Sequence, residues 1–173
     1  MRLFFPACLL LFLRPPATTA EELVAEAVMF EDKVWKGESG NYLGTLIFSQ
    51  SLNSTIVKVT GDLMNVAGSS LNGEHGFHVH ALGSLQGGCS SAAGHFNPEK
   101  KNHGGPKDSD RHVGDLGNIM ATNGKATVSL EDSVIQLHGP HSIIGRALVL
   151  HAEQDDLGKG GHSDSKTTGY FPT

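Results

Sequence analysis

The chain has 173 residues, of which 38% are hydrophobic, and a formal net charge of −5 at pH 7. This length suits one domain. The acidic balance argues against a nucleic-acid-binding surface, which requires a stripe of basic residues.

Residues 1–20 are predicted to form a secretory signal peptide. Their apolar run, residues 3–13, is too short to span a bilayer, and small residues at 17–20 are typical of a cleavage site near Ala20. The alternative is an N-terminal strand buried in the fold, where Pro6 would be awkward. We therefore expect a secreted protein whose domain comprises residues 21–173, with no later segment that spans a membrane. Cleavage would lower the net charge to −7, because it removes two arginines.

Cysteine usage is unusual for a secreted chain. Cys8 lies in the predicted signal segment, so Cys89 is the one cysteine of the mature sequence. An oxidising compartment permits disulfides, but the mature chain offers Cys89 no partner. We expect a free thiol or a bond to another molecule.

Short β-strands are predicted along the rest of the chain. β-Branched and aromatic residues, partial alternation and Gly or Asn punctuation favour strands, and no amphipathic pattern of ten or more residues predicts a helix. The fold class is therefore all-β, a Greek-key barrel or sandwich. The expected strands are residues 25–30, 44–48, 55–60, 75–80, 116–121, 125–130 and 147–151.

Two long polar loops separate or follow these strands. Residues 81–113 contain few apolar side chains, so packing alone cannot order them. Loops of this length in a compact domain are usually functional or disordered. A second polar loop spans residues 153–169.

A glycosylation sequon lies at Asn53-Ser54-Thr55. A secreted chain can carry a glycan at Asn53. Sequons this short also arise by chance, so occupancy stays open.

The first loop carries candidate zinc ligands. His95, His103 and His112 lie in it, and Asp115 begins the following strand. Three imidazoles and a carboxylate meet the requirements of a closed tetrahedral zinc site. Bound metal would also explain how a glycine-rich loop becomes ordered, because binding supplies free energy that packing cannot. The alternative is that all four are solvated loop residues.

A second group of histidines lies on predicted strands. His78 and His80 project to one side of an extended backbone, while Phe77 and Val79 point to the other side. His151 ends an apolar strand and can approach the pair. Three or four imidazoles without a thiolate suit a tetragonal copper ion that changes oxidation state. The alternative is a pair of surface histidines and a surface strand end. The remaining histidines, expected to be ordinary exposed or hydrogen-bonded residues, are His75, His138, His141 and His162.

Taken together, these motifs resemble the copper/zinc superoxide dismutases. The match runs from about residue 24 to residue 169. It is carried by Gly76-Phe77-His78-Val79-His80, Gly88-Cys89, Gly94-His95-Phe96-Asn97-Pro98, His103-Gly104-Gly105-Pro106-Lys107-Asp108, Arg111-His112-Val113-Gly114-Asp115-Leu116-Gly117-Asn118 and Asp155-Asp156-Leu157-Gly158-Lys159-Gly160-Gly161.

The resemblance implies a copper site and a zinc site that share one imidazole. The implied ligands are His78, His80, His95 and His151 for copper, and His95, His103, His112 and Asp115 for zinc. His95 would therefore bridge both ions through its two ring nitrogens. Asp155 resembles the carboxylate that links a ligand from each site, since ligating histidines are fixed by acceptors on their other nitrogen.

The implied reaction is disproportionation of superoxide into oxygen and hydrogen peroxide, by cycling of copper between Cu(II) and Cu(I), with zinc structural. His95 would deliver one of the protons. The anionic substrate benefits from positive local potential, to which Lys159 and Lys166 would contribute, although exposed solubilising lysines are the alternative.

After Gly169 the sequence departs from the family pattern. Family members continue with an arginine beside copper, a cysteine that pairs with the position of Cys89, and a final strand. We therefore expect slower turnover, a looser long loop, an exposed strand edge and a weakened homodimer. A truncated gene model or a splice form would account for the difference. The alternatives are a non-catalytic secreted copper/zinc-binding protein, favoured by the missing arginine, and a domain that docks to a partner donating the absent strand.

Overall fold

The computed structural model describes residues 7–14, 22–66 and 72–169. Its elements are nearly all strands, and each strand predicted beyond residue 21 is present, which confirms the all-β fold class. The elements are β1 (Ala7–Arg14), β2 (Glu22–Glu31), α1 (Asp32–Trp35), β3 (Tyr42–Ser51), β4 (Val57–Met64), β5 (Gly73–Val79), the 3₁₀ turn η1 (Cys89–Ala92), β6 (Asp115–Ala121), β7 (Lys125–Asp132) and β8 (Ala147–Leu150).

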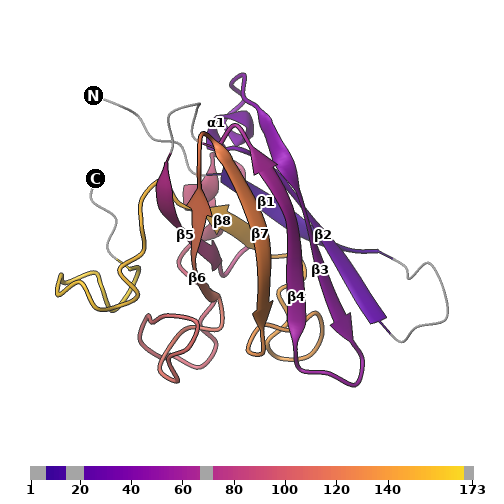
Figure 1. The fold of residues 1–173 in the computed structure, drawn as a ribbon, viewed down its shortest axis with the longest axis vertical. Helices are drawn as coiled ribbons and strands as arrows, with labels where there is room; N and C mark the ends of the chain where they lie inside the picture. Colours follow the sequence, from indigo (N-terminus) through magenta and orange to yellow (C-terminus); the bar gives the residue numbers. More distant parts are fainter. Residues whose placement is uncertain (1–6, 15–21, 67–71, 170–173) are drawn as a thin grey trace.

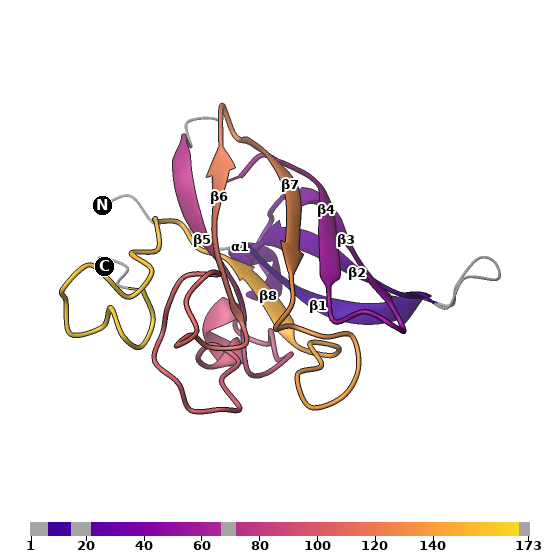
Figure 2. The same cartoon turned by 60° about the horizontal axis from the view of Figure 1, so that its bottom comes forward.

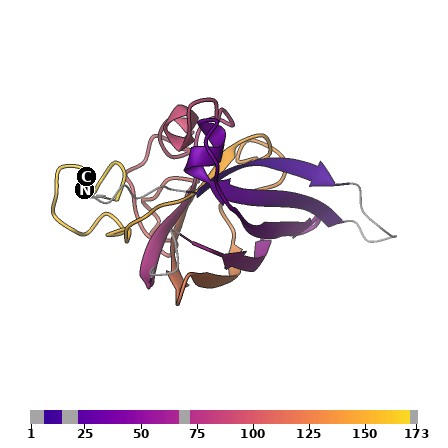
Figure 3. The same ribbon diagram turned by 90° about the horizontal axis from the view of Figure 1, so that it is seen from above.

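The strands form one antiparallel sheet in the order β6-β5-β8-β1-β2-β3-β4-β7 (Figure 1). The sheet curls around its core, which gives an open, barrel-like shape (Figure 3). Its two end strands, β6 and β7, are joined by a turn at Asn123 and Gly124, which both have positive φ. The residues on either side of this turn form one bridge, and no ladder between β6 and β7 follows it within the described residues.

The N-terminal strand β1 lies inside the sheet, between β8 and β2. It is antiparallel to both, and Ala7 is opposite Glu31 on one side and Leu150 on the other. The described part of the predicted signal segment thus adopts the strand that the sequence offered as the alternative. The other residues of that segment, 1–6 and 15–20, lie outside the described residues.

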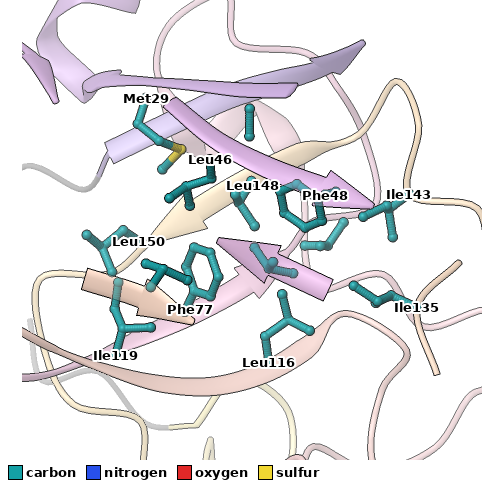
Figure 4. Packing of buried hydrophobic residues seen from close by; sticks show 14 of the residues in the cluster. Met29, Leu46, Phe48, Phe77, Leu116, Ile119, Ile135, Ile143, Leu148 and Leu150 are labelled. Atoms are coloured by element: carbon teal, nitrogen blue, oxygen red, sulfur yellow. The ribbon is translucent and has the colours of Figure 1, made fainter. Parts of the chain in front are cut away.

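The main core lies inside the curled sheet (Figure 4). Burial alternates along β2 with the period of two expected of a strand with one buried face. Short β8 departs from this rule because apolar groups cover both of its faces. Leu148 and Leu150 join the main core, whereas Ala147 and Val149 pack in a second cluster.

The two long polar segments lie side by side beyond the sheet (Figure 2). The loop between β5 and β6 is tied to the segment after β8 by a hydrogen bond from the His103 N–H to the Lys166 carbonyl, at 2.8 Å. Close packing returns the first loop to β5 at Gly114, where a Cβ atom would stand 2.1 Å from the Val79 carbonyl oxygen. These contacts place the histidines of loop and sheet together. In the described part of the chain, no helix has the length and apolar character needed to cross a membrane.

Candidate metal centre

His78 and His80 present their rings to one side of the sheet, as strand alternation requires. The ring centroid of His95 lies 4.1 Å from that of His78 and 5.2 Å from that of His80. His151, which follows β8, approaches the same pair, at 4.9 Å from His78 and 5.6 Å from His80. Phe77 is buried in the main core on the other side. The four histidines therefore gather from two neighbouring strands and one loop.

The first compact group of potential ligands consists of His95, His103, His112 and Asp115. One ligand atom from each lies within 4.8 Å of the others, and all four residues are buried. Asp115 Oδ1 is 2.9, 3.0 and 3.2 Å from the Nδ1 atoms of His95, His103 and His112. The Nδ1 atoms of His103 and His112 are buried, and among the described residues this carboxylate is the polar group that faces them. Buried nitrogens around one carboxylate fit a tetrahedral zinc ion, which would satisfy them.

Asp115 is held in place by the backbone. Its Oδ2 accepts the N–H groups of Gly104 at 3.1 Å and His112 at 2.8 Å. Burial raises the pKa of this carboxyl, but hydrogen bonds from His103, His112 and His95 outweigh that effect and lower it. Asp115 therefore carries its negative charge throughout the physiological range, as a metal ligand must.

His103 is pulled toward the charged form by two carboxylates. Burial lowers its pKa, yet hydrogen bonds to Asp115 and Asp155 raise it to about 9. In the absence of a cation, the proton of His103 supplies positive charge between these acids. A divalent cation at the Nδ1 side would take over that role.

The second group consists of His78, His95 and His151, whose ligand atoms also lie within 4.8 Å of one another. His80 is next to this group. Its Nδ1 lies 2.6 Å from the Ala93 carbonyl oxygen, which only accepts, so Nδ1 carries the hydrogen and Nε2 keeps its lone pair. That Nε2 atom is buried and makes no hydrogen bond.

Burial keeps the second group of imidazoles neutral. Desolvation, followed by repulsion from His95, lowers the pKa of His80 to about 4. Desolvation and the neighbouring imidazoles also hold the pKa values of His78 and His151 well below the usual range. Neutral imidazoles without a thiolate fit copper in either oxidation state. His95 belongs to both groups.

Asp155 links the two groups. Its Oδ2 lies 2.9 Å from His78 Nε2, its Oδ1 lies 2.8 Å from His103 Nε2, and its side chain is fully buried. A carboxylate in this position fixes the tautomer and orientation of one ligand from each group.

Two contributors received no role from the sequence, although Asn118 ends one of the motifs that carry the resemblance. Asn118 on β6 exchanges two hydrogen bonds with the backbone of Asp155, at 2.8 and 2.9 Å. His75, expected only to be an ordinary residue, is buried and places its Nδ1 3.1 Å from the His151 carbonyl oxygen. Both pairs are distant in sequence, and only the three-dimensional fold brings them together.

The other predicted residues are not members of the ligand groups. Lys159 and Lys166 are exposed and line a surface hollow of about 450 Å³ beside His103, where Lys159 Nζ pairs with Asp108 at 2.9 Å. Asn53 is exposed in the turn between β3 and β4. Cys89 is buried at the start of η1 and forms no disulfide within the described residues.

Comparison with known proteins places this arrangement in a family. Residues 42–171 match the family described as Copper/zinc superoxide dismutase (SODC). The chain is 52% identical over 137 residues to "Superoxide dismutase [Cu-Zn]" of Yarrowia lipolytica, and 49% identical over 137 residues to the protein of the same name from Cryptococcus neoformans var. grubii. Each alignment covers 79% of this chain and 86% of the relative. The crystal structure of the clock protein EA4 is 40% identical, with a TM-score of 0.68, and the alignment covers 95% of this chain and 85% of that one. The chain therefore belongs to the copper/zinc superoxide dismutase family.

Proposed function

We propose that this chain disproportionates superoxide, so that two superoxide anions and two protons give one oxygen and one hydrogen peroxide. The observation that carries the proposal is that His95 belongs to both ligand groups. Its Nδ1 lies 2.9 Å from Asp115 Oδ1, and its ring centroid lies 4.1 Å from that of His78. A ring shared in this way can couple a redox metal to a structural one. No thiolate among the described residues competes for either group.

The donor sets assign one metal to each group. Neutral imidazoles on His78, His80, His95 and His151 are proposed to hold copper, and His95, His103, His112 and Asp115 are proposed to hold zinc. Copper, when bound, would supply the electron chemistry by accepting an electron from one superoxide and giving it to the next. Zinc does not change oxidation state.

The protein's own contribution is the handling of a proton. His95 would take up a proton at Nε2 whenever that nitrogen is not bound to copper, and would deliver it to the second superoxide, while its Nδ1 stays on the side of Asp115, 2.9 Å from Oδ1. Asp155 is proposed to keep His78 and His103 oriented throughout. Lys159 and Lys166 are proposed to attract the anionic substrate, an effect that salt should weaken.

The test is superoxide decay followed with the protein loaded with both metals. Repeated turnover is expected, with no turnover after the same protein is stripped and reloaded with zinc alone. Consumption of superoxide only in proportion to the copper present would overturn the enzyme in favour of a copper- and zinc-binding protein.

We further propose that the protein is secreted, with residues 1–20 as its signal peptide, and that it carries a glycan at Asn53. The support is the apolar run followed by small residues in the sequence, together with the exposed sequon. Expression in cultured cells, followed by N-terminal sequencing and mass measurement of protein from the medium, is expected to show a start near Glu21 and added glycan mass. Recovery of the intact chain from cell lysate alone would contradict secretion.

A homodimer is also proposed. The support is membership of the copper/zinc superoxide dismutase family, whose usual form is a dimer, since a single exposed apolar side chain such as Leu82 is ordinary on a monomer. Sedimentation at several concentrations is expected to give a two-chain species that dissociates on dilution. A single-chain mass at all concentrations would contradict the dimer.

A further inference from the structure

Asp32, at the start of α1, is a buried acid to which the metal ligands assign no role. Its side chain is only 3% exposed. Its Oδ1 accepts the backbone N–H of Cys89 at 2.5 Å, and its Oδ2 lies 2.5 Å from Lys36 Nζ. Both carboxylate oxygens are thus satisfied, which offsets the cost of burying the charge.

The contact between α1 and the loop is close. At Gly88 a Cβ atom would stand 2.6 Å from Asp32 Oδ1 and 2.5 Å from Lys36 Cε. Gly88 also has φ +97°, a conformation that other residues rarely adopt. The ion pair therefore lies directly against the backbone that leads into η1.

From Cys89 the 3₁₀ turn η1 spans four residues and ends at Ala92. On leaving η1, the chain pairs with the segment that follows β5. The Leu82 N–H donates to the Ala92 carbonyl at 3.0 Å, and the Ala81 N–H donates to the Gly94 carbonyl at 2.8 Å. One short turn therefore connects the Asp32 contact to the backbone beside His80.

The residue between these two bonds, Ala93, holds a potential copper ligand. Its carbonyl accepts the Nδ1–H of His80 at 2.6 Å. Ala93 itself has a positive φ of 64° without being glycine, so its surroundings must hold this conformation in place.

We propose that Asp32 is a positioning residue for the copper ligand His80, acting through η1 and the Ala93 carbonyl. Asp32 accepts the first N–H of η1, and η1 determines the position of Ala93. The Ala93 carbonyl in turn orients the His80 ring through its hydrogen bond from Nδ1. The inference rests on the copper site proposed above. The zinc group shares His95 with the copper group but has further supports of its own, because Asp115 is held by Gly104 and His112, so Asp32 should affect copper much more than zinc.

Apolar packing also supports η1. Trp35 of α1 packs against a cluster formed by Leu85, Cys89, Ala92, Ala147 and Val149. The turn should therefore persist without the Asp32 carboxylate, but in a less defined position. The expected result of removing the carboxylate is a displaced ligand in a folded protein.

The test compares Asp32→Ala and Asp32→Asn with Glu31→Gln in the full chain loaded with copper and zinc. Glu31 is a matched control, because it is an adjacent, mostly buried acid that accepts the Asn41 N–H and pairs with Lys33, both at 2.9 Å. The readouts are the Cu(II) electron paramagnetic resonance spectrum and the affinity for each metal by chelator competition. Asp32→Ala is expected to shift the copper spectrum and to weaken copper binding about tenfold, with a clearly smaller loss of zinc affinity. Glu31→Gln is expected to change neither.

A copper spectrum and affinity like those of the parent in Asp32→Ala would overturn the proposal, and so would equal losses for copper and zinc. If Asp32→Ala does not fold, Asp32→Val supplies the same comparison, since it removes both acceptor oxygens while supplying a larger apolar side chain. Asp32→Asn keeps an oxygen that can accept the Cys89 N–H and is expected to stay closer to the parent. Failure of the copper site itself is distinguishable, because the parent protein would then lack a nitrogen-coordinated copper signal before any substitution.

Discussion

At the scale of single residues, the metal centre depends on which nitrogen of each imidazole is engaged. The Nδ1 atom of His80 is bonded to a carbonyl, and the Nε2 atoms of His78 and His103 face Asp155. The second nitrogen of each of these three rings faces the ligand groups. Orientation, rather than the mere presence of histidine, makes the site, and the residues that fix orientation are therefore the sharpest points to test.

Asp155→Ala is expected to weaken binding of both metals, because one carboxylate orients His78 and His103 together. Outer-shell substitutions of this kind typically cost about 10–100-fold in metal affinity. Chelator competition on the two metals measures the loss. Asp156→Ala is the control, since Asp156 accepts bonds from Gly158 and Ser165 and organises the same segment without an imidazole contact. Equal losses of metal affinity in Asp155→Ala and Asp156→Ala would show that only the ordering of the segment after β8 matters, and not the contacts of Asp155 with the two imidazoles.

Gly114→Ala is expected to destabilise the fold, because its Cβ would stand 2.1 Å from the Val79 carbonyl oxygen, and neither backbone can easily move. Overpacking typically costs about 1–3 kcal/mol. The control is Gly94→Ala, where no atom lies within 4 Å of the added Cβ. Urea denaturation compares the free energies of unfolding. A Gly114→Ala protein as stable as Gly94→Ala would mean that the loop and β5 are not packed as described.

At the scale of elements, some features were predictable and others were not. The strand that carries His78 and His80 was predictable, because alternation with Phe77 and Val79 is local to the sequence. Asn118 and Asp155 are 37 positions apart, and Asp32 and Cys89 are 57 positions apart. Pairs of this kind depend on how the loops return to the sheet, so local patterns carry no signal for them. The family resemblance supplied Asp155, and nothing in the sequence supplied Asp32.

The strand β1 shows a local pattern that suits two structures. Its apolar residues predict a signal peptide, and the same residues form a strand that pairs on both edges. Deletion of residues 1–20 is expected to expose the facing edges of β2 and β8, which lowers the free energy of unfolding and promotes association. Urea denaturation and light scattering measure both effects. Deletion of residues 1–6 alone is the control, since it leaves β1 intact.

Unchanged stability and no association after deletion of residues 1–20 would mean that β1 is dispensable. In that case a signal peptide could be removed without cost to the fold. The opposite result would mean that a mature protein starting near residue 21 needs another strand to cover the gap.

At the scale of the whole molecule, the two polar segments meet at the candidate metal centre. Residues 81–114 and the segment after β8 converge on buried imidazoles and carboxylates, although Phe96 and Val113 of the first loop also join the main core, contrary to the expectation that packing contributes little there. Metals that bind the folded chain should therefore stabilise it, by about 4 kcal/mol for each metal at a thousand times its dissociation constant. Calorimetry before and after chelation is expected to show a large fall in melting temperature, restored by zinc and copper together. An apo protein that melts with the holo protein would contradict this dependence.

The central claim is that one imidazole ring, that of His95, lies between two metal ions. Anomalous diffraction from crystals of the protein loaded with copper and zinc, recorded at the absorption edge of each metal, tests it most directly. Two separate peaks are predicted, one on either side of the His95 ring, with copper beside His78, His80 and His151 and zinc beside His103, His112 and Asp115. Ions bound to ligand sets that do not share His95, or a single peak, would contradict the account.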